Sequence, residues 1–131
     1  MTITRDSKRT WDYVCEEDRA LPPEEQTVWT LGVLTSRAQA AILDASITTG
    51  PKGAQVERPG SAQLMVVAYG LKGVRNLQDG DGNPVELSWQ TGSGGARVSD
   101  ELLDSVPPQV RIELFTEIAR LNRLDATDRK N

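Results

Sequence analysis

The strongest structural signal in this sequence lies near its C-terminus, where apolar residues recur at helical spacing after a pair of prolines at 107–108. Proline is well tolerated in the first turn of a helix, so this pair marks where the helix begins. The residues of the apolar face are Val110, Leu114, Ile118 and Leu121, with Phe115 beside them. Such a face is stable only when other elements cover it. We therefore predict an amphipathic helix over 107–124 and a core, built by the rest of the chain, that packs against it.

Three other segments have the composition of β-strands. The stretch Trp11–Glu16 alternates in the manner of a short half-buried strand, and Thr27–Leu34 is rich in β-branched and aromatic residues. A further strand is indicated at Val85–Trp89, directly after the turn-forming run Asp79–Pro84.

Two helices are indicated by residues that can cap them. Thr35 or Ser36 can cap a helix that ends near Ser46. Ser99 can cap a short helical turn over Asp100–Val106, whose first residues are acidic, as the helix dipole favours.

The middle of the chain reads as a loop followed by an apolar helix. Glycines and prolines punctuate Ile47–Gly60, so we expect a loop with a small hairpin around Gln55–Arg58. From Ser61 the apolar residues follow helical spacing, and Gly70 or Gly73 can close the helix in the left-handed conformation. A buried strand is the competing interpretation, because two valines adjoin there.

These elements predict one α+β domain in which a few antiparallel strands are packed by two to four helices, one of them the C-terminal amphipathic helix. A chain of 131 residues with 37% hydrophobic residues is long enough for one core. We place the domain at 11–124, between a flexible arm at 1–10 and a polar tail at 125–131. The glycine-rich run Gly92–Gly95 is expected to be a flexible spacer.

The chain contains no histidine and a single cysteine, Cys15. Without histidine it lacks the commonest metal ligand and the usual base that activates a nucleophile, so we expect no zinc site and a buried, structural Cys15. The run Asp79–Asn83 matches the first ligands of a calcium-binding loop, but Pro84 stands where that loop needs glycine and Gln90 where it needs glutamate. We assign no catalytic residue, metal or cofactor, and interpret the protein as non-enzymatic.

Acidic residues outnumber basic ones by 19 to 15, which gives a formal net charge of −4. The basic residues are scattered, so we expect no direct binding to nucleic acid and none to membranes. No apolar run at the N-terminus suggests a signal segment, and we expect a cytoplasmic protein. The one local concentration of charge, Asp12–Glu25, is acidic and is either a solvated loop or a docking surface for a basic partner.

Three stretches of the chain follow one another in the same order as similar stretches in a group of known proteins. An acidic, proline-containing lead-in precedes a strand at 16–42, a Gly-Leu-x-Gly segment with an Asp-Gly turn occupies 70–87, and a Pro-Pro-opened helix with a polar tail occupies 106–131. In this order the chain resembles a group of small tailed-bacteriophage morphogenesis proteins, often described as tail assembly chaperones. The stretches cover a little over half of the chain; Pro51–Ser61 and Gly92–Gly95 have no counterpart. The resemblance implies a context, phage particle assembly, and transfers no functional residue.

Two hypotheses follow from that resemblance. In the first, the protein is a tail assembly chaperone that binds other phage tail proteins in the host-cell cytoplasm. In the second, it is a structural component of the virion, such as a capsid-decorating, head-to-tail connecting or tail protein. A weaker third hypothesis is an inhibitor that presents Asp12–Glu25 to a basic host surface. The candidate partner-binding residues are Trp11, Tyr13, Glu16, Glu17, Asp18 and Trp29, although core burial is the favoured explanation for the two tryptophans. The sequence leaves open whether the protein is a homo-oligomer.

Overall fold

The structure is a computed structural model that describes the backbone of residues 8–130 and the side chains of residues 8–123. Within this part the strands are β1 (Thr10–Tyr13), β2 (Val28–Gly32), β3 (Ile47–Thr49), β4 (Gln55–Glu57), β5 (Leu71–Arg75), β6 (Trp89–Gly92) and β7 (Gly95–Val98). The α-helices are α1 (Ser36–Ser46), α2 (Pro59–Gly70), α3 (Asp100–Ser105) and α4 (Pro108–Lys130), and three short 3-10 helices are η1 (Glu16–Ala20), η2 (Pro23–Glu25) and η3 (Pro51–Gly53). The α+β fold with small antiparallel sheets and a C-terminal helix is confirmed.

The main sheet has three antiparallel strands in the order β1-β2-β5. Trp11 of β1 lies opposite Leu31 of β2, and Trp29 of β2 lies opposite Val74 of β5. Trp29 and Leu31 are 2% and 0% exposed, whereas Thr30 between them remains partly exposed. This alternation follows from the two-residue period of a strand, so one face of β2 is part of the core.

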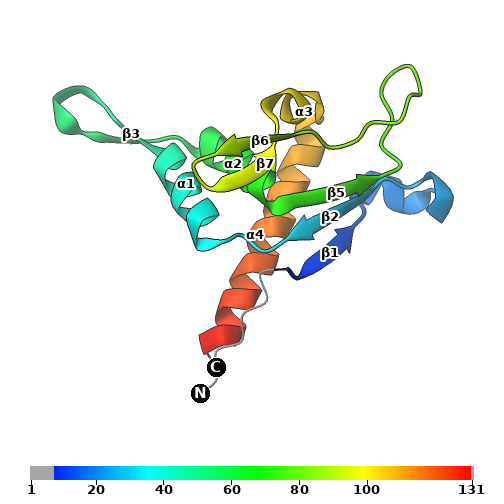
Figure 1. The fold of residues 1–131 in the computed structure, drawn as a ribbon, viewed down its shortest axis with the longest axis horizontal. Coiled ribbons are helices and arrows are strands. Elements are labelled where there is room, and N and C mark those ends of the chain that lie inside the picture. Colours follow the sequence, from blue (N-terminus) through cyan, green and yellow to red (C-terminus); the bar gives the residue numbers. More distant parts are fainter. Residues whose placement is uncertain (1–7, 131) are drawn as a thin grey trace.

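Helix α4 crosses the molecule beside this sheet and contributes its apolar face to the same core (Figure 1). Leu114, Ile118 and Leu121 are buried, as their spacing predicted. Asn122 fixes the helix to the end of β2, because its amide oxygen accepts a 2.8 Å hydrogen bond from the backbone of Leu34 and its amide nitrogen donates to the carbonyl of Gly32.

The predicted helix after Ser61 is present but begins at Pro59, and its end differs from the prediction. Neither Gly70 nor Gly73 is left-handed; α2 runs directly into β5 at Leu71 without a loop. A Cβ atom on Gly70 would lie 2.6 Å from a methyl group of Ile118, so the glycine allows α2 and α4 to approach closely. Strand β5 was not predicted from the sequence.

Two sequence predictions around residue 90 were wrong. The strand expected at Val85–Trp89 begins only at Trp89, and the expected spacer Gly92–Gly95 is the turn of the hairpin formed by β6 and β7. The phenol oxygen of Tyr69 accepts a 2.9 Å hydrogen bond from the backbone of Gly94. Gly92 and Gly94 therefore allow the turn to pack on α2, since a side chain at either residue would collide with Tyr69.

The expected loop Ile47–Gly60 is largely a hairpin of β3 and β4, which projects from the body of the molecule (Figure 1). The hairpin predicted around Gln55–Arg58 is thus present and begins earlier in the chain. The caps at Thr35 and Ser99 are confirmed, because each side chain accepts a hydrogen bond from the backbone three residues later.

The two ends of the chain differ from the expected boundaries. The predicted arm at 1–10 overlaps β1, which begins at Thr10, and its residues 1–7 lie outside the described residues. Helix α4 continues to Lys130, beyond the predicted end at Leu124. Residues 125–130 contain neither glycine nor proline, so no helix breaker separates the expected tail from the helix.

Candidate functional site

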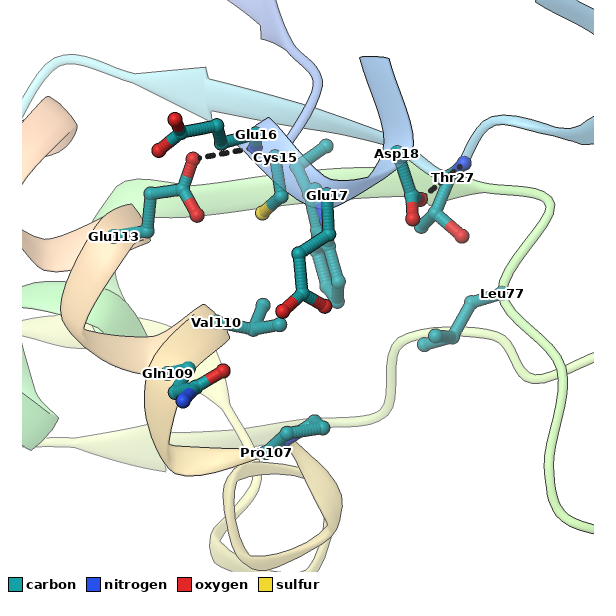
Figure 2. A pocket seen from close by; sticks show the side chains of 11 residues that line it. Cys15, Glu16, Glu17, Asp18, Thr27, Leu77, Pro107, Gln109, Val110 and Glu113 are labelled. Atoms are coloured by element: carbon teal, nitrogen blue, oxygen red, sulfur yellow. Dashed lines mark hydrogen bonds between the residues drawn. The ribbon is translucent and has the colours of Figure 1, made fainter. Parts of the chain in front are cut away.

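A cavity of about 600 Å³ opens between η1, the segment after β5 and the first turns of α4. Its volume falls within the roughly 300–1,000 Å³ of typical ligand pockets. The lining combines an apolar floor with the uncharged polar residues Thr27 and Gln109 and with four acidic residues, Glu16, Glu17, Asp18 and Glu113 (Figure 2). We refer to it as the acidic cavity.

The floor of the acidic cavity comes from three separate parts of the chain. Trp29 is supplied by β2, Leu77 by the segment after β5, and Val110 by α4. Trp29 is almost fully buried, whereas the other two are partly buried and pack against the core. A ligand in the cavity would therefore contact side chains that the core already holds in place.

Glu113 is the most strongly fixed of the four carboxylates. One of its oxygens accepts hydrogen bonds from the phenol of Tyr13 at 2.6 Å and from the backbone of Glu16 at 2.8 Å. Desolvation alone would raise the pKa of Glu113, but these hydrogen bonds favour the charged form and the net effect is a lowered pKa. The carboxylate is therefore ionised at neutral pH and holds η1 against α4.

The other three carboxylates come from η1, and they differ in how they are held. Asp18 accepts a 3.1 Å hydrogen bond from the backbone of Thr27, whereas Glu16 and Glu17 are exposed. Glu17 extends from η1 into the space in front of α4 (Figure 2). None of the four carboxylates forms a salt bridge with another residue of the described part of the chain. The acidic cavity thus has an excess of negative charge that a cationic group could neutralise.

Cys15 lies at the inner edge of the acidic cavity and is buried, as the sequence predicted. Burial, and then the negative charge of Glu113, raise the pKa of the Cys15 thiol to about 12. Because the thiolate is the nucleophilic form, Cys15 is unsuited to covalent catalysis at neutral pH.

The structure gathers most of the predicted partner-binding residues around this cavity. Glu16, Glu17 and Asp18 form part of the lining, and Trp29 forms part of the floor with little exposed surface. Tyr13 contributes indirectly, through its hydrogen bond to Glu113.

Trp11 does not line the acidic cavity; it lies on β1, where the guanidinium of Arg9 stacks on its ring at 4.9 Å. Sequence reasoning missed Glu113, Val110 and Leu77. Glu113 and Val110 were visible only as residues of a helix, and nothing local connects that helix with an acidic segment about 100 residues earlier.

The described residues contain no group of three or more side chains able to hold a metal ion. At the predicted turn, the carboxylate of Asp79 accepts hydrogen bonds from the backbones of Asp81 and Asn83, at 2.9 and 3.0 Å. These hydrogen bonds lower the pKa of Asp79 and close the turn through protein atoms. None of the helices in the part of the chain that the structure describes is long and apolar enough to cross a membrane.

Comparisons of this chain with models of protein families, with curated protein sequences and with solved structures find no match.

Proposed function

We propose that this protein is a non-enzymatic assembly protein of a tailed bacteriophage, a tail assembly chaperone that binds another tail protein through the acidic cavity. The observation that supports this proposal most directly is the combination of an apolar floor with four carboxylates in one cavity. The resemblance in sequence order supplies the phage context, and the host-cell cytoplasm is the place where such assembly occurs.

The chemistry of the acidic cavity defines the kind of segment it would bind. An apolar side chain on Leu77 and Val110 would gain free energy from burial, at roughly 25 cal/mol for each Å² removed from water. A lysine or arginine beside that apolar side chain would be attracted by Glu17 and the other carboxylates of the cavity. Such attraction favours fast and selective association more than high affinity. We infer a partner segment in which basic and apolar residues alternate or adjoin.

A binding assay with purified tail-tube and tape-measure proteins tests the proposal. We expect one of them to co-purify with the wild type, and the double substitution Glu16→Lys, Glu17→Lys to abolish the binding. Both residues are exposed, so the fold should tolerate the change. The matched control is Glu24→Lys, Glu25→Lys, which reverses two charges in the same acidic segment but outside this cavity. Failure of the wild type to bind either protein would contradict the chaperone function.

A structural role in the virion is the second candidate, and the projecting hairpin of β3 and β4 favours it. Every residue of the two strands is exposed, so the hairpin offers a surface that neighbouring subunits in a particle could cover. Mass spectrometry of purified particles separates the two candidates. A copy number comparable to that of a capsid or tail protein would establish the structural role, whereas absence from particles and presence in infected cells would support the chaperone.

A further inference from the structure

The projecting hairpin of β3 and β4 exposes large apolar side chains to solvent. Ile47 and Val56 are 38% and 43% exposed, although each has a large apolar side chain. Strands of three residues each, without a covering layer, are marginally stable in water. Covering the hairpin would therefore bury apolar surface and stabilise it.

The tip of the hairpin presents a single cation. The turn is closed by hydrogen bonds from the backbone of Gly50 to the carbonyl of Ala54, at 2.6 Å, and from Ala54 back to Pro51. Lys52 lies at its apex in the left-handed conformation, with φ of 62°, and is exposed. The hairpin's one acidic residue, Glu57, lies at its base, so the tip itself is positive.

The acidic cavity has the complementary properties. It offers apolar side chains, among them Leu77 and Val110, and four carboxylates without a salt bridge to any described residue. Figure 1 shows the hairpin at the opposite end of the molecule from η1, which forms one wall of the cavity. A hairpin therefore cannot enter the cavity of its own molecule.

We propose that the protein self-associates head to tail, with the Lys52 tip of one molecule inserted into the acidic cavity of a second copy. Lys52 would contact Glu17 and its neighbours, and Pro51 and Val56 would cover part of the apolar floor. Because the two contacting surfaces differ, each molecule keeps one free tip and one free cavity. Such heterologous contacts build rings or open filaments rather than closed pairs. The same cavity cannot hold Lys52 and the segment of a tail protein at once.

Sedimentation velocity of the purified protein tests this directly. We expect the average mass to rise with protein concentration and to return to that of the monomer in about 1 M salt, where the Debye length is only about 3 Å. Lys52→Glu and Glu17→Lys should each weaken the association at least tenfold, or about 1.4 kcal/mol. The controls Lys8→Glu and Glu86→Lys reverse the same charges at exposed residues outside the hairpin and the cavity and should leave it unchanged.

Mixing the two variants supplies the decisive result. The tip that carries Lys52→Glu meets a cavity in which Glu17→Lys leaves three carboxylates beside one ammonium group, so this pairing stays weak. The other pairing in the mixture joins an unchanged Lys52 to an unchanged Glu17, and association should therefore return. A wild type that stays monomeric up to its solubility limit would overturn the proposal, as would association that neither variant weakens. Because no tail protein is present, either result would leave the proposed function untouched.

Discussion

The phenol of Tyr13 donates a 2.6 Å hydrogen bond to the carboxylate of Glu113, which lies 100 residues later in the sequence. The same carboxylate oxygen accepts a hydrogen bond from the backbone of Glu16 at the start of η1. One side chain of α4 therefore holds both the end of β1 and the first turn of η1. The position of η1 in turn sets where Glu16, Glu17 and Asp18 stand around the acidic cavity.

Replacing Glu113 with alanine should destabilise the protein by about 1–3 kcal/mol, because the Tyr13 phenol and the Glu16 amide lose their shared acceptor. Tyr13→Phe should have a smaller effect of about 0.5–1.5 kcal/mol, because the carboxylate keeps its other donor. Urea unfolding measures both. A second alanine substitution on the same helix, at the partly buried Glu117, breaks an ion pair with the exposed Arg120 and should change stability by less than about 1 kcal/mol. Equal effects of Glu113→Ala and Glu117→Ala would contradict the anchoring role.

The lowered pKa of Glu113 also predicts how stability depends on pH. A carboxyl group with a lower pKa in the folded state stabilises the protein fully above its unfolded pKa, about 4.3, and this contribution is lost as the pH falls through the folded value. The difference in free energy of unfolding between the wild type and Glu113→Gln should therefore be constant from pH 7 to about 5 and shrink below that. A difference that stays constant down to pH 3 would show that the charge of Glu113 is irrelevant.

Cys15 should resist alkylation in the folded protein. Its pKa of about 12, raised by burial and by Glu113, leaves almost no thiolate at pH 8. Iodoacetamide should therefore react much more slowly with the native protein than with the protein in urea, where an unperturbed thiol has a pKa of about 8.5. Mass spectrometry of the time course measures both rates. Similar rates in the two conditions would mean that η1 opens readily and exposes the thiol.

Gly70→Ala should destabilise the protein by about 1–3 kcal/mol, because the new methyl group would lie 2.6 Å from Ile118. The matched control is Gly60→Ala in the first turn of the same helix, where an added Cβ meets nothing within 4 Å. That control should be neutral or stabilising by up to about 1 kcal/mol, since alanine has the higher helix propensity. Thermal unfolding of the two variants gives the comparison, and equal effects would argue against close packing of α2 on α4.

The elements that the sequence predicted well are those whose signals are local. The caps at Thr35 and Ser99 and the apolar spacing of α4 each reside in one short segment, and each appears in the structure. Strand β5 was missed because Leu71–Arg75 follows a helix with no intervening turn and contains few β-branched residues. Its pairing with β2, which makes it a strand, is a relationship between distant segments.

The acidic cavity shows the same limit at the level of a site. The sequence shows an acidic run that contains Glu16, Glu17 and Asp18, and it shows Trp29 as an aromatic residue in a predicted strand. Their assembly into one cavity depends on Glu113, which a single sequence does not connect with them. Only the packing of α4 beside β1 and η1 brings them together.

The glycine-containing turns around Gly80 and around Gly94 offer very different opportunities for protein engineering. Side chains added at Gly80 and Gly82 would meet nothing within 4 Å, although the φ angle of +81° at Gly82 still favours glycine there. Side chains added at Gly92 and Gly94 would instead collide with Tyr69. A fluorescent label or an affinity tag inserted beside Gly80 should leave the domain intact. The same insertion at Gly94 should separate the hairpin of β6 and β7 from α2. The Asp79–Asn83 turn is thus the natural attachment point for a label or a tag on this protein.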